Sequence, residues 1–288
     1  MRSLEPAAQD LAQVLPPLLL AARRVAATLM QGLHGRRRSG PGEDFWQFRP
    51  YTQGDNAAGI DWRKSARSGR VLIREREWAA ANTLWIWAAS GPGMDWHSKL
   101  SPITKSARAD LVTMAMAVLA AQAGERVGLL GAPITPGHSR LTLSRIASAL
   151  ETARAPQTLP PAADLPRFSS LLLAGDFLEP IANITSRFTQ LAAHAAHAHV
   201  VEIADPAEET LPWSGRVEFQ EMSGANRLTF GQAQSVRQAY LQRRAQHRAK
   251  LRDLTRRLGW SHTLHRTDQP AATLMLTLHD LLRGEPGA

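Results

Sequence analysis

The chain has 288 residues, a formal net charge of +9 at neutral pH and no cysteine. The lack of cysteine excludes a disulfide scaffold, a thiolate metal site and a cysteine nucleophile. An apolar fraction of 44% allows one sizeable core, and the basic charge balance favours acidic partners such as nucleic acid, anionic lipid or an acidic protein surface.

The N-terminal part predicts a helix followed by an extended segment. Apolar residues recur at helical spacing over 9–34, interrupted by Pro16-Pro17, and 44–78 read as extended chain with turns. The apolar run Val14–Leu20 is too short to span a bilayer, and no signal peptide precedes it. We therefore expect no membrane span and a cytoplasmic protein.

From residue 82 onward, strands alternate with helices. Apolar runs predict strands at 82–89, 126–131, 169–174, 198–203 and 261–265. Amphipathic stretches predict helices at 107–123, 139–154, 180–194, 231–258 and 271–283, and a short ribbon of 216–219 with 227–230. This alternation favours parallel pairing through right-handed crossovers. We predict an α/β fold with a doubly wound, mostly parallel sheet over 81–288, on which residues 1–80 pack.

The segment 48–77 places charges of both signs among large apolar residues. We favour a partly buried network of ion pairs and hydrogen bonds, because buried charges are costly to leave unpaired. The alternative is a docking surface for a partner. The residues of this signature are Tyr51, Gly54, Asp55, Asp61, Trp62, Arg63, Arg67, Arg74 and Glu75.

This signature resembles that of a bacterial family known as domain of unknown function family fifty-eight. The matching residues are Tyr51, Gly54, Asp55, Ile60, Asp61, Trp62, Ser65, Ala66 and Arg67. Pro50 breaks the family's arginine-tyrosine pair, but stretches at 124–129, 175–177 and 205–216 extend the resemblance over most of 30–285. The resemblance implies a von Willebrand factor A-like fold and an association with MoxR-type AAA+ ATPases in protein assembly or activation.

The resemblance also implies a place for a metal ion, in the loop after the first strand of the sheet. There, an aspartate and two serines supply the hard oxygens that magnesium prefers. In this sequence Ala89, Gly91 and Gly93 occupy those three positions. Asp176 still matches a later acidic position, and Asp95 is a poor substitute because its backbone position is offset. We therefore expect a degenerate, metal-free site and no cofactor.

Other side-chain clusters give little support for chemistry. The histidines between 194 and 199 have a spacing compatible with zinc, but the predicted change from helix to strand scatters them. The carboxylates of 205–209 follow a strand end, where they can serve acid–base chemistry or cap a helix. No nucleophile elbow, zinc-protease helix or Walker loop occurs, so we predict no enzymatic activity.

The leading hypothesis is a non-enzymatic interaction module that assists a MoxR-type AAA+ ATPase or binds its client. The predicted contact surface, called the predicted rim, consists of Ser90, Met94, Asp95, Trp96 and Asp176. One alternative is a basic module that binds nucleic acid or anionic lipid through Arg36–Arg38 and the helix around 243–257, with a steep salt dependence. Another is a metal-dependent hydrolase, which chelators would inactivate.

Overall fold

The chain divides into two compact units. The computed structural model describes residues 15–34, 47–51, 62–75, 83–152, 154–167, 169–220 and 226–282. The large unit contains residues 1–33 and 82–288, and the small unit contains 34–81. The predicted packing of residues 1–80 on the sheet stays a prediction. Within the described ranges, the helices are too short or too polar to cross a membrane.

The small unit is a two-stranded antiparallel sheet with one short helix. Strand β1 (Gln47–Pro50) pairs with β2 (Leu72–Glu75), and helix α3 spans Trp62–Ser68. The extended prediction is correct for the two strands and wrong for α3, whose arginine, lysine and alanine residues favour a helix. The Oγ atom of Ser65 accepts a hydrogen bond from the Leu72 backbone nitrogen at 2.9 Å, which ties α3 to β2.

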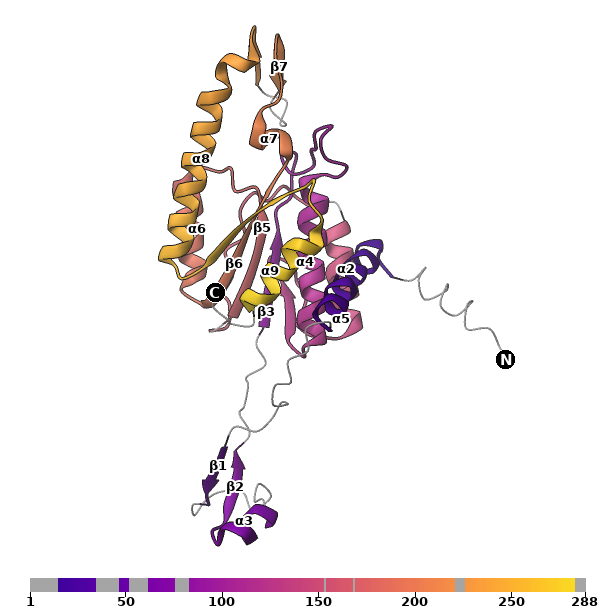
Figure 1. The fold of residues 1–288 in the computed structure, drawn as a ribbon, viewed down its shortest axis with the longest axis vertical. Helices are drawn as coiled ribbons and strands as arrows, with labels where there is room; N and C mark the ends of the chain where they lie inside the picture. The colour runs from indigo at the N-terminus through magenta and orange to yellow at the C-terminus, as the bar shows by residue number, and fades with distance from the viewer. Residues whose placement is uncertain are drawn as a thin grey trace, which may run out of the picture. The chain divides into compact units, whose positions relative to one another are not determined.

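The large unit is built on a parallel sheet (Figure 1). Among the described residues, its five strands are β3 (Thr83–Ala88), β4 (Arg126–Leu129), β5 (Ser169–Gly175), β6 (Ala195–Ala204) and β9 (Ser261–Arg266). Their order is β4-β3-β5-β6-β9, and every neighbouring pair is parallel. This confirms the predicted α/β class and doubly wound sheet. The strand order reverses direction between β3 and β5, which is where such sheets bind ligands.

Helices cover the sheet on both sides (Figure 1). The helices that the structure describes in this unit are α2 (Pro17–His34), α4 (Lys105–Gln122), α5 (Arg140–Glu151), α6 (Ile181–Ala192), α7 (Pro206–Thr210), α8 (Ala233–Arg257) and α9 (Ala271–Leu282). Helix α4 packs on β3 and β5 with α5 and α9 against it, while α6 packs on β6 and α8 on β9. The predicted ribbon is also confirmed, as antiparallel strands β7 (Val217–Gln220) and β8 (Arg227–Phe230).

A chain of aromatic rings crosses the core on the side of α6. The ring of Phe177, just after β5, lies 6.2 Å from Trp87 and 5.7 Å from Phe188, measured between centroids. Phe188 in turn lies 5.3 Å from Trp260, which precedes β9. All four rings are buried. Contacts between aromatic rings add to the free energy gained by burying them, so this row of rings fixes the end of β5 relative to α6 and α8.

Replacing Phe188 by alanine should therefore lower the free energy of unfolding by about 3–5 kcal/mol, since it leaves a cavity between two rings. Urea denaturation followed by circular dichroism measures the loss. Leu141→Ala is the matched control, because Leu141 on α5 is 59% exposed and should change stability by less than about 0.5 kcal/mol. Similar losses in the two variants would contradict this packing.

Candidate functional site

A buried ammonium group lies where the parallel strands end. Lys105, the first residue of α4, is 1% exposed. Its Nζ atom lies 3.0 Å from Oδ2 of Asp176 and 2.6 Å from Oε1 of Glu208. Burial alone would lower the pKa of Lys105, but the two carboxylates outweigh it and raise the pKa, so the lysine is charged at neutral pH.

The backbone on either side of Asp176 holds its carboxylate in place. A Cβ atom on Gly175 would lie 2.9 Å from that of Ala89, so only glycine fits at the end of β5. Phe177 has a φ of 47°, a left-handed conformation that is unusual for an aromatic residue. Its carbonyl oxygen accepts a hydrogen bond of 2.7 Å from Nε2 of His247 on α8. The turn that presents Asp176 is therefore tightly constrained.

Glu208 reaches Lys105 from a capped helix start. Oδ1 of Asp205 accepts a hydrogen bond from the backbone nitrogen of Ala207, and Oε2 of Glu208 accepts one from that of Asp205. This capping box confirms the helix-cap interpretation for two of the predicted carboxylates. Oδ2 of Asp205 also accepts from the Ser98 backbone nitrogen at 2.9 Å. The loop after β3 is thus anchored to the loop after β6.

A second ion-pair network connects α8 to β6 and α7. Arg248 donates to both oxygens of Glu202, at 2.8–3.0 Å, and to both oxygens of Glu209, at 2.7 and 2.9 Å. Arg244 donates to Glu209 at 2.7 Å, and His262 of β9 lies 3.1 Å from Glu202. Burial alone would raise the pKa of Glu202, but its hydrogen bonds and the arginine charges lower that pKa to about 2.

This network changes the interpretation of the basic helix. Two of the arginines predicted to form a polyanion-binding face, Arg244 and Arg248, are partly or largely buried and neutralised by carboxylates. Other cations of α8, including Arg243, Lys250 and Arg252, are exposed. Arg36–Arg38 lie outside the described residues. Part of the positive charge of α8 therefore stabilises the fold and is not available to bind a polyanion.

The predicted rim is mostly buried. Ser90 donates a hydrogen bond to the carbonyl of Ala155, and Asp176 is paired with Lys105. Met94 is 1% exposed and belongs to the core, because the turn at 91–94 directs it inward. The prediction that Met94 is an apolar residue of the contact surface is therefore wrong.

Only part of the predicted rim reaches the surface. Asp95 is exposed and Trp96 is half-buried. The sequence analysis missed two exposed leucines at the same end of the sheet, Leu100 (52%) and Leu178 (50%). An exposed leucine in a loop has no periodic signal that would identify it.

Of the three positions implied for metal ligands, Gly93 lies close to Asp176, and none of the three carries a side-chain oxygen. A Cβ atom on Gly93 would lie 3.9 Å from Oδ2 of Asp176, whereas Ala89 is buried. Gly91 has a φ of +125° and faces Pro156, so a side chain there would be strained. In the part of the chain that the structure describes, no three His, Asp or Glu side chains are grouped to hold a metal ion.

The histidines considered for zinc are separated by their environments. Nδ1 of His199 lies 2.6 Å from Oγ of Ser261, on the neighbouring strand β9. Burial, together with the charge of His197, lowers the pKa of His199 to about 4, so it is neutral at pH 7. His197 is exposed and His194 lies in the turn before β6. Each histidine thus meets a different part of the structure.

The signature segment is described only in part. Gly54, Asp55 and Asp61 lie outside the described residues, and Arg74 and Glu75 belong to β2 with side chains that are not described. The other four signature residues are exposed, with Trp62 at 67% and Tyr51 at 39%, and include Arg63 and Arg67. Within the small unit these four are exposed, because a two-stranded sheet with one short helix encloses little apolar volume, and their expected burial against the central sheet stays a prediction.

Comparison with known families gives one match. The model of the family described as "Protein of unknown function DUF58" matches residues 47–250. This range includes parts of both units and the carboxylates and cations around Lys105. No match was found among curated proteins or among solved structures.

The low pKa of Glu202 predicts how stability depends on pH. A carboxylate with a folded pKa of about 2 and an unfolded value of 4.5 stabilises the fold above pH 4.5 and loses that contribution as the pH falls towards 2. Glu202→Gln should therefore cost roughly 3 kcal/mol at pH 7 and flatten the acid limb of the stability curve.

The measurement is urea denaturation of wild type and variant at several pH values. Glu218→Gln is the control, because Glu218 forms an exposed pair with Arg227 at 3.4 Å, which should contribute less than about 1 kcal/mol. An unchanged acid limb in Glu202→Gln would show that Glu202 titrates normally.

Proposed function

The chain belongs to the family of proteins of unknown function DUF58, and we propose that it is a non-enzymatic module that binds other proteins. In this proposal its cation site is degenerate, and a lysine side chain holds the place of a metal ion. The observation that carries the proposal is the ammonium of Lys105 between Asp176 and Glu208, with Nζ–O distances of 3.0 and 2.6 Å.

The positive charge of Lys105 supports the view that an ammonium group, and not a metal ion, occupies this place. A divalent ion beside Asp176 would meet the positive charge of Lys105 at short range, in a site with little water to screen the repulsion. Glycine at 91 and 93 offers no hydroxyl to complete a ligand shell. Lys105 has carboxylate partners on two elements, so its charge is satisfied without an ion.

The resemblance of the signature segment implies the partner class. We propose a von Willebrand factor A-like module that assists a MoxR-type AAA+ ATPase, or binds a client of one, in protein assembly or activation. The topology supports a contact at the carboxyl edge of the sheet, because the strand order reverses there between β3 and β5.

Exposed side chains on the loops at that edge define the contact surface. Leu100 follows β3 and Leu178 follows β5, and both are about half exposed. Asp95 adds an exposed carboxylate on the first of these loops. Apolar groups surrounded by polar ones are the usual composition of a protein contact. Leu100, Asp95 and Leu178 thus replace the buried members of the predicted rim in this proposal.

The alternative of a polyanion-binding module has less support. Two of its arginines are committed to carboxylates, and Arg256 of the same helix pairs with Asp253 at 2.6 Å. Of the exposed cations on α8, Arg243, Lys250 and Arg257 lie on one side of the helix and Arg252 on the opposite side. This leaves a short cationic stripe, whereas tight binding of a polyanion needs many phosphate contacts. We therefore favour a protein partner.

Metal titration tests the proposal that the ammonium of Lys105 takes the place of a metal ion. Calorimetric titration of the wild type with Mg²⁺ or Mn²⁺ should show no saturable site, and Mn²⁺ should leave its melting temperature unchanged. Lys105→Met removes the ammonium partner of Asp176 and Glu208 and should cost about 3–5 kcal/mol of stability. Mn²⁺ should restore part of that loss, because it binds the folded state.

The control for this experiment is Lys105→Met combined with Asp176→Asn, which removes one carboxylate and should make the protein insensitive to Mn²⁺. A micromolar metal site in the wild type would contradict the exchange.

Capture from native lysate tests the partner and the surface. The full chain should retain a MoxR-type ATPase, identified by mass spectrometry, and Leu100→Asp combined with Leu178→Asp should reduce the captured amount at least about tenfold, as for central apolar contacts. Leu141→Asp, at a comparably exposed leucine on α5, should bind normally. If the wild type captures no such ATPase, the partner class is wrong; if the double variant still captures it, the surface is wrong.

A further inference from the structure

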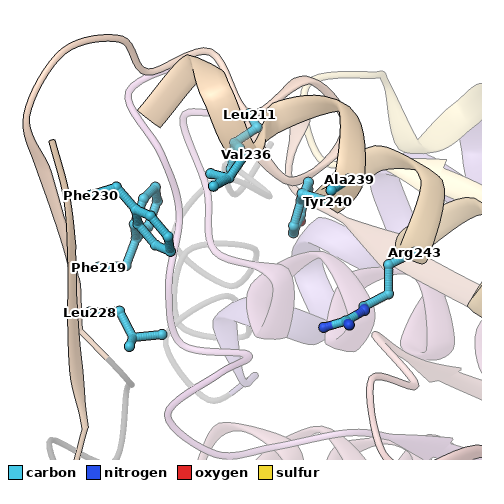
Figure 2. Close-up of a pocket in the computed structure, with 8 residues that line it drawn as sticks. All are labelled: Leu211, Phe219, Leu228, Phe230, Val236, Ala239, Tyr240 and Arg243. Atoms are coloured by element: carbon cyan, nitrogen blue, oxygen red, sulfur yellow. The ribbon is translucent and has the colours of Figure 1, made fainter. Parts of the chain in front are cut away.

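An apolar groove lies between the β7–β8 ribbon and the first half of α8. Figure 2 shows the ribbon's side chains on one side of the groove and those of α8 on the other. The groove has a volume of about 460 Å³, within the range of binding sites for small ligands and side chains. Its lining residues are Leu211, Phe219, Leu228, Phe230, Val236, Ala239, Tyr240 and Arg243.

The ribbon presents an apolar face that the fold does not fully cover. Phe219 pairs with Leu228 across the two strands, so their side chains lie on the same face. The ring of Phe219 makes edge-to-face contacts with Phe230, at 5.9 Å, and with Trp213, at 5.6 Å. Leu228 is 62% exposed. The rings of Phe219 and Phe230 form an apolar wall of the groove. The exposed side chain of Leu228 extends this wall into the solvent.

One cation at the end of the groove is available for a ligand. Arg243 is exposed, and within the described residues it forms no ion pair, whereas its neighbour Arg244 is bound to Glu209. Arg243 lies two turns along α8 from Val236, on the same stripe, and exposed Lys250 follows two turns further. A ligand that fills the apolar part and carries a carboxylate could therefore place that carboxylate next to Arg243.

The kind of occupant follows from the charge of the groove and from the proposed function. The groove combines an apolar wall with one exposed cation, Arg243, so it suits a ligand that joins apolar groups to an acidic one. A protein-binding module would take such a ligand from a polypeptide, as an amphipathic segment with acidic residues beside its apolar side chains.

We propose that this groove docks a segment of a partner protein in which apolar side chains stand next to an aspartate or glutamate. The apolar side chains fill the space against Phe219, Leu228 and Phe230, and the carboxylate pairs with Arg243. The inference rests on the proposed function as a protein-binding module and assigns it a second contact surface, distinct from the leucines at the carboxyl edge.

Peptide binding to the full chain tests the inference by fluorescence anisotropy. The probes are a labelled amphipathic peptide with leucines one helical turn apart flanked by glutamates, and the same peptide with lysines in place of the glutamates. The wild type should bind the acidic peptide about tenfold more tightly, as for one charge pair at an interface. Arg243→Glu should reverse this preference, and Leu228→Asp should abolish binding of both peptides.

Two control variants separate the groove from general charge and exposure. Arg252→Glu changes an exposed cation nine residues further along α8, on the opposite side of the helix, and should keep the preference for the acidic peptide. Leu141→Asp changes a leucine with 59% exposure on α5 and should leave binding unchanged. Because Arg243 is exposed, its charge reversal decides the question even if Leu228→Asp fails to fold.

The outcomes separate this inference from the proposed function. An unchanged preference in Arg243→Glu, or displacement of the peptides by sodium laurate at lower concentration than either peptide binds, would overturn the docking of a polypeptide. If full-chain capture of the ATPase succeeds while the peptides fail to bind, the groove is wrong and the proposed function stands. If the peptides bind as expected and no ATPase is captured, the partner class is wrong and the groove stands.

Discussion

The buried charge of Lys105 is the constraint on which the carboxyl edge of the sheet depends. An ammonium that is 1% exposed loses its hydration, and only close carboxylates can compensate for that loss. The two carboxylates come from the turn after β5 and from α7, while the lysine opens α4. One charge therefore fixes three elements that are far apart in the sequence, at the place where the strand order reverses.

The strongly basic composition has a second consequence inside the fold. The inward side of α8 presents Arg237, Arg244 and Arg248 at intervals of seven and four residues. Arg237 donates to the carbonyls of Leu211 and Trp213, and the other two pair with carboxylates of β6 and α7. A long polar helix can thus pack against the sheet through charge pairs as well as apolar contacts, and net charge alone is a poor guide to its partners.

Most elements of the large unit follow from local patterns. Strand β3 is an apolar run with two tryptophans, and α8 begins two residues after its predicted start and ends one residue before its predicted end. Such predictions succeed because a strand buried on both faces, or a long helix with one inward side, leaves a repeating signal. The short helix α3 was missed because seven residues give little periodicity, and its attachment through Ser65 depends on a strand that comes later in the chain.

The site was predicted less well, because its chemistry is not local. Lys105 follows Thr104, which caps α4, and a lysine near a helix start normally faces water. Only the three-dimensional arrangement brings Asp176 and Glu208 to it. The sequence did indicate the right edge of the sheet, through Asp176 and the glycines before Met94. It could not indicate that Met94 turns inward, because that depends on the turn which begins at Gly91.

The conformation of Gly91 bears on whether a metal site could simply be restored. In the proposed exchange of a metal ion for an ammonium, the loop after β3 is reshaped as well as stripped of its oxygens. A serine at 91 would have to adopt a φ of +125° and approach Pro156 to within 3.1 Å, both of which are unfavourable. Even with that serine in place, Lys105 would still repel a divalent ion beside Asp176. Backbone and charge thus oppose the metal independently: Lys105→Met alone would leave the two carboxylates as ligands, and a complete ligand set would also require a change to the loop.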